Sequence, residues 1–377
     1  LGERLDRLEK YLKGIHYIGE IPESVRDSIL SYGERLSSLL LTLTLRHHGI
    51  DAEEALPENI GLLTDGEFRN ATVQYDLSAP SVGRALSGDK DYVIPGFYGV
   101  SEAGKVNLLG RGGSDYSAAA IARCIGAESL DIWKDVAGFR SADPKLVANS
   151  RPIAHLSYRE AAELSYFGAR ILHPRTVEPL LKPNIPIRIF NVDNPDPELK
   201  PVTVISREGS GTSGRARSVT YTDDLAILKI SGAGVGLKPG LLARVTSALE
   251  GAGINLKSVV TAQTAINLYL QEEDLDRAAA AVEGLDMASL TEILPRRNLS
   301  IIAMVGEEIA DHPEIAEQML EALAKAGIPY SILSLGASQA AAYFVIPRER
   351  RPEAVRVLHE RIFGELSAGQ SLSEQQA

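Results

Sequence analysis

The chain has 377 residues, enough for two or three domains of about 100–200 residues each, and its 44% of hydrophobic residues excludes wholesale disorder. The net charge is −11, from 50 acidic and 39 basic residues, so nucleic acid is not an expected partner. The single cysteine excludes a disulfide framework and predicts a reducing cytoplasm, and no apolar run reaches the roughly 20 residues of a membrane span.

The N-terminal part of the chain predicts three helices. Residues 1–13 carry leucines at helical spacing, Pro22 begins a second helix, and Leu39–Arg46 forms a third, mostly buried one. Glu34 lies where the third helix begins, directly after a glycine. A carboxylate there is either a solvated group that favours the helix dipole or a binding group. Residues 49–94 then predict short strands, turns and one short helix.

The stretch Leu109-Gly-Arg-Gly-Gly-Ser-Asp-Tyr-Ser117 joins a predicted strand to a predicted helix. Such a turn lets bare backbone approach a ligand, and the free N–H groups at the helix start favour negative charge. Arg111 adds a cation with a planar fork of donors. Asp115 is either a catalytic group or an N-terminal cap. The alternative for the whole stretch is an ordinary glycine turn that Ser114 or Asp115 caps.

Strands alternate with helices beyond this stretch. Ser129–Trp133 predicts a strand with Trp133 in the core, a capping-box helix begins at Ser157, and Ile185–Phe190 predicts another strand. The fold class is therefore α/β, with a largely parallel sheet sandwiched by helices. Ligands gather at the carboxyl ends of the strands in such sheets, and Arg111, Lys134 and Asp135 are expected there.

The second half of the chain contains an internal repeat. Residues 193–218 are rich in turn residues and predict a linker. Residues 219–290 and 291–366 each predict a βαββα order, which indicates two ferredoxin-like domains. The polar tail 367–377 is expected to be disordered.

Five segments together resemble an aspartate kinase (aspartokinase) of the amino-acid kinase family. They are Ser31-Tyr-Gly-Glu-Arg-Leu-Ser37, Gly110-Arg-Gly-Gly-Ser-Asp-Tyr-Ser117, Trp133-Lys-Asp-Val136, Ala142-Asp-Pro144 and Tyr166-Phe-Gly-Ala-Arg-Ile-Leu-His-Pro174. They occur in the family's order and roughly at its spacings, and the resemblance covers nearly the whole chain. It implies an amino-acid kinase catalytic domain over 1–192, followed by ACT domains at 219–290 and 291–366.

The family phosphorylates the β-carboxylate of L-aspartate with MgATP, which gives 4-phospho-L-aspartate for lysine, threonine and methionine biosynthesis. The resemblance implies that Glu34 binds the substrate ammonium and Arg111 its carboxylate, beside Gly112 and Ser114. Asp115 and Arg170 would be catalytic. The residues implied for the nucleotide are Lys134, Asp135, Arg140, Lys145, Arg170 and Ile171. The nucleotide would supply most of the Mg²⁺ ligands, and no protein metal site is expected.

The resemblance also implies allosteric feedback by an amino acid and a homodimer formed through the ACT domains. Asn255, Gln263 and Asn267 would contact the effector. Lys257 stands where some lysine-inhibited members carry an aspartate. A cation there disfavours lysine, so threonine is the favoured effector and lysine the alternative.

The chain departs from the family in several places. The family begins with a strand carrying Lys-Phe-Gly-Gly, whose lysine contacts the transferred phosphate, and no such motif is present. Residues 1–377 alone are therefore expected to have little or no activity. Lys134 stands where threonine is common, Arg140 where tyrosine is common, and Arg170 where lysine is common.

Two other functions stay open. The first is a non-catalytic, amino-acid-sensing ACT protein that keeps a kinase-like domain. The second is another amino-acid kinase, such as one acting on glutamate. The paired ACT-like units and the Ser-Tyr-Gly-Glu segment speak against the second.

Overall fold

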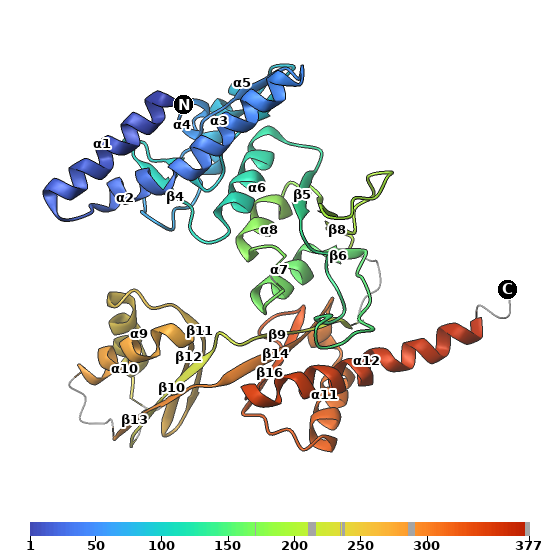
Figure 1. Ribbon diagram of the computed structural model, residues 1–377. Coiled ribbons are helices and arrows are strands. Elements are labelled where there is room, and N and C mark those ends of the chain that lie inside the picture. The colour runs from blue at the N-terminus through green and yellow to red at the C-terminus, as the bar shows by residue number, and fades with distance from the viewer. Residues whose placement is uncertain (170, 210–215, 234, 236–237, 286–290, 374–377) are drawn as a thin grey trace. The chain divides into compact units, whose positions relative to one another are not determined.

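The computed structural model describes residues 1–377 except 170, 210–215, 234, 236–237, 286–290 and 374–377, and Figure 1 shows its elements. The chain divides into two compact units. The first contains residues 1–139 and 152–212, and the second contains residues 140–151 and 213–377.

The described part of the first unit contains eight helices. They are α1 (Gly2–Ile18), α2 (Glu23–Leu30), α3 (Tyr32–His47), α4 (Pro57–Ile60), α5 (Tyr75–Ala85), α6 (Gly113–Ile125), α7 (Tyr158–Tyr166) and α8 (Pro174–Leu181). α6 buries Ala119, Ala120 and Ile121 and ends at a glycine in the left-handed region. α7 begins with the predicted capping box, in which Ser157 and Glu160 exchange side-chain and backbone hydrogen bonds.

The strands of the first unit form three small sheets within the described residues. β1 (Ala52–Glu54) pairs with β2 (Asp91–Val93) in parallel, and β3 (Tyr98–Val100) pairs with β4 (Val106–Leu108) antiparallel. The third sheet has the order β5 (Leu130–Lys134), β7 (Ile187–Asn191), β8 (Thr203–Ser206) and β6 (His155–Ser157). Its β5–β7 and β6–β8 pairs are parallel, while β7–β8 is antiparallel.

The alternation of β5 places Trp133 outside the core. Leu130 and Ile132 are buried, whereas Trp133 is 45% exposed and stacks on Phe190 with ring centroids 4.7 Å apart. The prediction of a core tryptophan was wrong, because successive side chains of a strand point to opposite faces. Trp133 thus shares the face of Asp131.

β8 lies inside the segment 193–218 that was expected to be linker. Thr203 and Ile205 are buried while the residues after each of them are not, which is the period of a half-buried strand. The turn residues on both sides of these four residues conceal that short pattern in the sequence.

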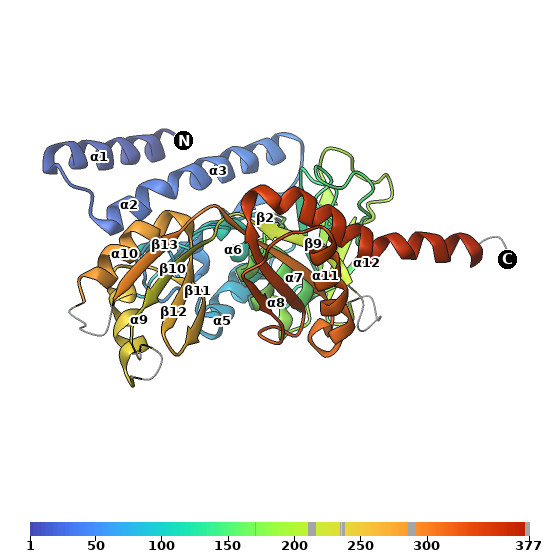
Figure 2. The ribbon, with the colours of Figure 1, turned by 90° about the horizontal axis from the view of Figure 1, so that it is seen from below.

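The second unit contains two ferredoxin-like modules. The first module has strands β10 (Ala226–Ser231), β11 (Leu256–Ala262), β12 (Ala265–Leu270) and β13 (Glu292–Arg296), with helices α9 (Leu241–Gly251) and α10 (Leu275–Glu283). The second has strands β9 (Ala216–Thr222), β14 (Leu299–Gly306), β15 (Ile332–Ser334) and β16 (Ala341–Pro347), with helices α11 (Pro313–Lys325) and α12 (Arg351–Ser373). Figure 2 shows both modules from below.

Each module gains a fourth strand beyond the expected βαββα order. The sheet orders are β11-β12-β10-β13 and β15-β16-β14-β9, with antiparallel pairing throughout. β9 precedes the first module in the chain but pairs with β14 of the second. The first module is therefore an insertion between two neighbouring strands of the second.

One face of each sheet carries both helices of its module. In the first module, side chains of α9 and α10 enter one core with β10 and β12. In the second module, α11 and α12 enter one core with β14 and β16. α12 continues to Ser373, through part of the tail that was expected to be disordered, and 374–377 lie outside the described residues.

Residues 140–151 are built into the second module. Ala142 and Val147 belong to its core together with Val219. The backbone N–H of Val219 donates to Ser141 O at 2.8 Å, and the Tyr221 hydroxyl donates to Asp143 at 2.8 Å. The segment that the sequence associates with the nucleotide thus belongs structurally to the second unit.

Stability of the second unit should depend on pH through His359 of α12. This side chain is 4% exposed, its Nε2 lies 2.8 Å from Ser141 Oγ, and burial, followed by the charge of Arg151, lowers its pKa. The unfolded chain then binds the proton more readily, so the free energy of unfolding should fall as the pH is lowered through about 6.5.

Replacing His359→Gln should remove this contribution. Urea denaturation at pH 7.5 and pH 5.5 measures the difference, and wild type should lose more stability on acidification than the variant. His312→Gln, at a partly exposed side chain, is the control and should keep the wild-type pH dependence. An identical pH dependence in wild type and His359→Gln would contradict the prediction.

Candidate active site

The glycine-rich loop before α6 needs its glycines for steric reasons. Gly110 and Gly112 have φ angles of 78° and 70°, in the region that favours glycine. A Cβ on Gly110 would lie 2.9 Å from Asn70 Oδ1, and one on Gly112 would overlap the His173 side chain. Arg111 lies between these two closely packed glycines, and its side chain is exposed on the surface. Its guanidinium makes no hydrogen bond or ion pair within the described residues.

The N-terminus of α6 is open toward a ligand. In the described structure no side chain caps it, so the interpretation of Ser114 or Asp115 as an N-terminal cap was wrong. Ser114 is exposed and Asp115 is half-buried in the first turn. The Gly113 N–H donates to Gly110 O at 3.0 Å, so the backbone N–H groups of Ser114 and Asp115 and the positive end of the helix dipole are what α6 offers to an anion.

An ion pair joins α6 to the end of β5. Lys134 Nζ lies 2.9 and 3.2 Å from the two Asp115 carboxylate oxygens. The side chains are 28% and 22% exposed, so the pair contributes at most about 1 kcal/mol to stability. Its main consequence is geometric, because it holds one cation and one carboxylate side by side at the carboxyl end of a strand.

Glu34 lies in the first turn of α3 and is half-buried. It makes no hydrogen bond or ion pair in the part of the chain that the structure describes. Its neighbour Arg35, by contrast, pairs with Glu58 at 2.5 Å. A half-buried carboxylate without a cation suits an ammonium ligand. No interaction joins Glu34 directly to Arg111 among the described residues.

The predicted nucleotide residues are divided between the two units. Asp135 is exposed immediately after β5, and Ile171 is half-buried shortly before α8. Arg140 and Lys145 belong to the second unit, where Arg140 Nε donates to Ser150 Oγ at 3.0 Å and Lys145 is exposed. Arg170 lies outside the described residues. Among the predicted nucleotide residues that the structure describes, Lys134 alone is in contact with Asp115.

The predicted effector residues do not form one site within a chain. Asn255 and Gln263 are exposed at opposite ends of β11, and Asn267 lies on β12 opposite Val260. The seven residues of β11 span roughly 23 Å at 3.3 Å per residue, too far for one amino acid to contact both ends.

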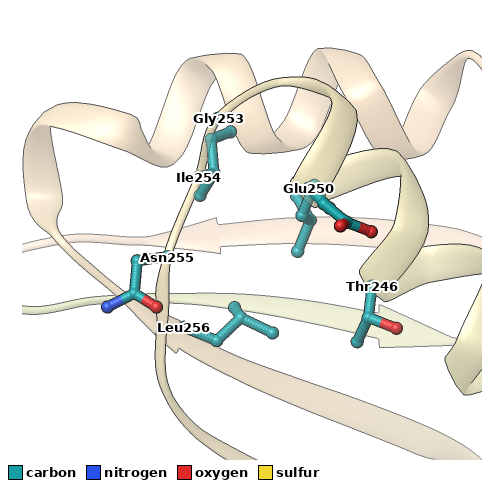
Figure 3. A pocket seen from close by; sticks show the side chains of 7 residues that line it. Thr246, Glu250, Gly253, Ile254, Asn255 and Leu256 are labelled. Carbon is teal, nitrogen blue, oxygen red and sulfur yellow. The ribbon is translucent and has the colours of Figure 1, made fainter. Parts of the chain in front are cut away.

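Asn255 lines an open cavity of about 470 Å³ at the C-terminal end of α9 (Figure 3). The other lining residues are Thr246, Leu249, Glu250, Gly253, Ile254 and Leu256. An amide, a carboxylate and a hydroxyl therefore surround an apolar floor in the first module.

Two residues near the loop were missed in the sequence. His173 caps α8 by accepting the Arg175 N–H at Nδ1, and its side chain lies against Gly112. Burial lowers the pKa of His173, and the charges of Arg175 and Arg111 lower it further. Arg175 donates to the backbone carbonyls of Leu109 and Ala71 at 2.9 and 2.8 Å. The one feature of the sequence that points to these two residues is the His-Pro-Arg stretch, because a proline there is typical of a helix start.

Comparison with known proteins assigns the class. Residues 4–191 match the model of the amino acid kinase family, and residues 228–284 and 302–362 match that of the ACT domain. The glycine loop at α6 and the two ferredoxin-like modules are thus those of an amino-acid kinase joined to ACT domains, as the resemblance implied.

Individual relatives narrow the class further. The chain is 34% identical to a bifunctional aspartokinase/homoserine dehydrogenase of Haemophilus influenzae, over 95% of this chain and 44% of the relative. It is 30% identical to the chloroplastic aspartokinase 2 of Arabidopsis thaliana, over 96% of this chain and 68% of the relative. The chain belongs to the aspartokinase family. It spans less than half of the length of the first relative.

Solved structures agree on the fold. E. coli aspartokinase III in complex with aspartate and ADP (R-state) superposes with a TM-score of 0.80 at 24% identity, covering 95% of this chain and 81% of that one. The same enzyme in complex with lysine and aspartate (T-state) gives 0.76 at the same identity and coverage. These comparisons confirm the predicted fold class.

Neither a membrane span nor a metal cluster is found in the part of the chain that the structure describes. None of the described helices is long and apolar enough to cross a membrane. No group of three or more His, Cys, Asp or Glu side chains among them is placed to hold a metal ion.

Asp115 should act in the transition state. Replacing Asp115→Ala is expected to lower kcat at least about tenfold more than it changes the affinity for aspartate, because an interaction made only in the transition state appears in kcat. The measurement is ATP-dependent acyl phosphate formation, trapped as hydroxamate, on the chain extended by an N-terminal strand that carries Lys-Phe-Gly-Gly. Asp131→Ala is the matched control, since Asp131 pairs with Arg188 at 2.5 Å on the exposed side of β5. Near-normal turnover combined with a lower melting temperature would leave Asp115 a structural role only.

Proposed function

We propose that this protein transfers the γ-phosphoryl group of ATP to the β-carboxylate of L-aspartate. The observation that carries the proposal is the loop before α6, where Arg111, which has no partner within the described part of the chain, stands next to an uncapped helix N-terminus and the Asp115–Lys134 pair. This arrangement supplies a site for a carboxylate beside a site for phosphate. The E. coli relative solved with aspartate and ADP supports the same pair of ligands.

Arg111 and Glu34 bind the amino-acid end of the substrate in this proposal. A free guanidinium fork can accept the α-carboxylate with two parallel hydrogen bonds. A free, half-buried carboxylate can accept the α-ammonium. Neither group has an internal partner to give up within the described residues, so binding costs no existing ion pair.

The other side of the loop suits phosphate. The glycines bring backbone close to a ligand without a Cβ in the way, and the uncapped start of α6 offers N–H donors. Lys134 adds a cation, and Asp115 lies within reach of it to orient the reacting groups. ATP supplies the phosphoryl group when bound, and Mg²⁺ neutralises phosphate charge, held mainly by the nucleotide itself. Lys134, Asp135 and Ile171 are the proposed nucleotide contacts in the first unit, and Arg140, Lys145 and Arg170 complete the proposed set.

The alternative is a non-catalytic amino-acid sensor. An amino-acid sensor would not need an uncapped helix N-terminus beside a lysine and an aspartate, and the structure retains all three. Binding of MgADP to the chain distinguishes the two functions, because a pure sensor should bind the amino acid alone.

Regulation through the second unit is the next part of the proposal. β11 and β13 are the two edge strands of their sheet, and an open edge is usually paired or covered, so a homodimer through the ACT modules is expected. The cavity beside Asn255 is the proposed effector site, with Gln263 and Asn267 as outer contacts in the assembled dimer. The proposed domains are a kinase domain over 1–192 and ACT domains over 219–290 and 291–366, and the proposed compartment is the cytoplasm.

Arg111→Ala should raise the KM for aspartate by the equivalent of about 2–4 kcal/mol, because it removes a charge-assisted bidentate pair. Arg111→Lys should recover only part of the loss, since an ammonium lacks the fork. Arg188→Ala, at an exposed arginine paired with Asp131, is the matched control. Aspartate kinetics of Arg111→Ala that match wild type would remove Arg111 from the site.

Threonine should bind the chain and lysine should not. Lys257 lies two residues after Asn255, and its ammonium disfavours a second cation nearby, although the Asp224 carboxylate at 3.1 Å compensates part of its charge. Calorimetric titration of the whole chain measures both, and light scattering measures the dimer. The whole chain is needed because residues 140–151 and β9 contribute to the second module.

Asn255→Ala should weaken threonine binding, and exposed Arg244→Ala on the same module should not. Binding of neither amino acid to a monomeric chain would refute both the effector site and the dimer. Binding of lysine with threonine silent would refute only the choice of effector, and the lysine complex of the E. coli relative makes that comparison worthwhile.

A further inference from the structure

Asp27 of α2 is a buried carboxylate to which the function described above assigns no role. Its side chain is 0% exposed. One oxygen, Oδ2, accepts two backbone N–H groups, from Leu108 at 2.8 Å and from Arg69 at 2.9 Å. No cation pairs with this carboxylate among the described residues. Burial of a carboxylate costs free energy, and the two backbone hydrogen bonds offset part of that cost. A buried acidic side chain at this position therefore needs a structural reason.

The two hydrogen bonds of Asp27 join the elements that carry the proposed substrate contacts. Leu108 ends β4, two residues before the glycine loop that presents Arg111. On the other side, α2 leads through a single helical residue, Ser31, into α3. Glu34 lies in the first turn of α3, so one buried carboxylate connects the helix of Glu34 to the strand of Arg111. Figure 1 shows α2 beside β4, and the two elements are in contact.

Backbone hydrogen bonds make the connection along the helices rigid. The Ser31 N–H donates to Asp27 O at 3.1 Å, and the Arg35 N–H donates to Ser31 O at 3.1 Å. Helical bonding thus continues from Asp27 into the turn of Glu34. A displacement of Asp27 would be transmitted to Glu34 because no flexible loop separates them.

Arg175 binds the same backbone through other groups. It donates to Leu109 O at 2.9 Å and to Asn70 Oδ1 at 2.9 Å, and its guanidinium lies 4.4 Å from the centre of the Tyr116 ring. The Ala71 N–H also donates to Leu108 O at 2.9 Å. Residues 69–71 and 108–109, which we name the loop base, are therefore held by an anion and by a cation at once.

We propose that Asp27, with Arg175 bound to the same loop base, is a positioning residue that sets the spacing between Glu34 and Arg111. This inference rests on the proposed function, in which these two groups bind the ammonium and the carboxylate of one small amino acid. The two charges of an α-amino acid are a fixed distance apart, so the two protein groups must keep a matching distance. A displacement of about 1 Å is enough to cost on the order of 10² in such a site.

A purely structural role for Asp27 predicts different changes in stability and ligand affinity. Loss of the buried hydrogen bonds would then lower stability and change every ligand affinity alike, or none. A positioning role predicts a selective loss, in which aspartate binds more weakly while MgADP binds as before. Recovery of aspartate affinity by an isosteric residue at position 27 further distinguishes the positioning role from the structural one.

The experiment titrates residues 1–377 and their variants with aspartate and, separately, with MgADP. Asp27→Ala should raise the aspartate Kd at least about tenfold and change the MgADP Kd less than about twofold. Asp27→Asn keeps a carbonyl oxygen for both N–H donors and should stay within about threefold of wild type for aspartate. Glu160→Ala is the matched control: Glu160 is also a fully buried carboxylate that accepts a backbone N–H, at the start of α7. It should lower the melting temperature without a selective loss of aspartate affinity.

Arg175→Lys decides the outcome if Asp27→Ala does not fold. It keeps the charge but loses the fork that reaches Leu109 and Ala71 together, so the same selective loss is expected. Wild-type aspartate affinity in the folded Asp27 and Arg175 variants, or equal losses of both ligands, would overturn the inference. Arg111→Ala separates failure of the proposed substrate site from failure of the role of Asp27. An unchanged aspartate Kd in Arg111→Ala would refute the substrate site itself. Weaker aspartate binding in Arg111→Ala, together with wild-type binding in Asp27→Ala, would refute only the role of Asp27.

Discussion

The close approach of backbone at the glycine loop is the constraint on which the first unit depends. Gly110 and Gly112 lie so near Asn70 and His173 that no other residue fits without movement. The loop in turn leaves the start of α6 without a side-chain cap, so that an anion can reach its N–H groups. Everything around the loop either holds its backbone or places a charge beside it. Asp27 and Arg175 hold the backbone, and Lys134 and Asp115 provide the charges.

The second unit follows from a different constraint, the need of each small sheet for a fourth strand. The second module takes β9 from the segment before the first module, so the two modules cannot be separated by cutting the chain between them. Residues 140–151 then add apolar side chains to the same core and a buried hydrogen bond between Ser141 and His359. A segment inside the stretch that matches the amino acid kinase family is therefore stabilised by the core of the second ferredoxin-like module.

The charges near the loop differ in how much they contribute to folding. The Asp115–Lys134 pair is partly exposed and contributes little to stability. Asp27 is fully buried, and two backbone N–H groups replace water at its Oδ2, while its Oδ1 has no hydrogen-bond partner among the described residues. Groups of the first kind can change partners when a ligand arrives, whereas groups of the second kind cannot move without disturbing the core. The structure thus distinguishes partly exposed charges from a charge that is fixed in the core.

The sequence by itself determined the local patterns. Alternating strands and helices identified the α/β class, the repeat identified two ferredoxin-like modules, and the capping box at Ser157 was confirmed. The glycine loop with Arg111 and Asp115 was recognisable because its residue types and spacing are local. The burial of Trp133 was predicted wrongly, because β5 has one exposed face and the sequence does not show which face that is.

Only the tertiary structure decided which distant residues act together. Asp27 and Leu108 are 81 positions apart, and Arg175 lies 66 positions beyond Leu109, so no local pattern could reveal that they hold one loop. The pairing of β9 with β14 and the burial of Ala142 in the second module have the same origin. Hydrogen-bond partners and core neighbours are chosen when the chain closes on itself, because that closure decides which backbone groups lose water and must find each other.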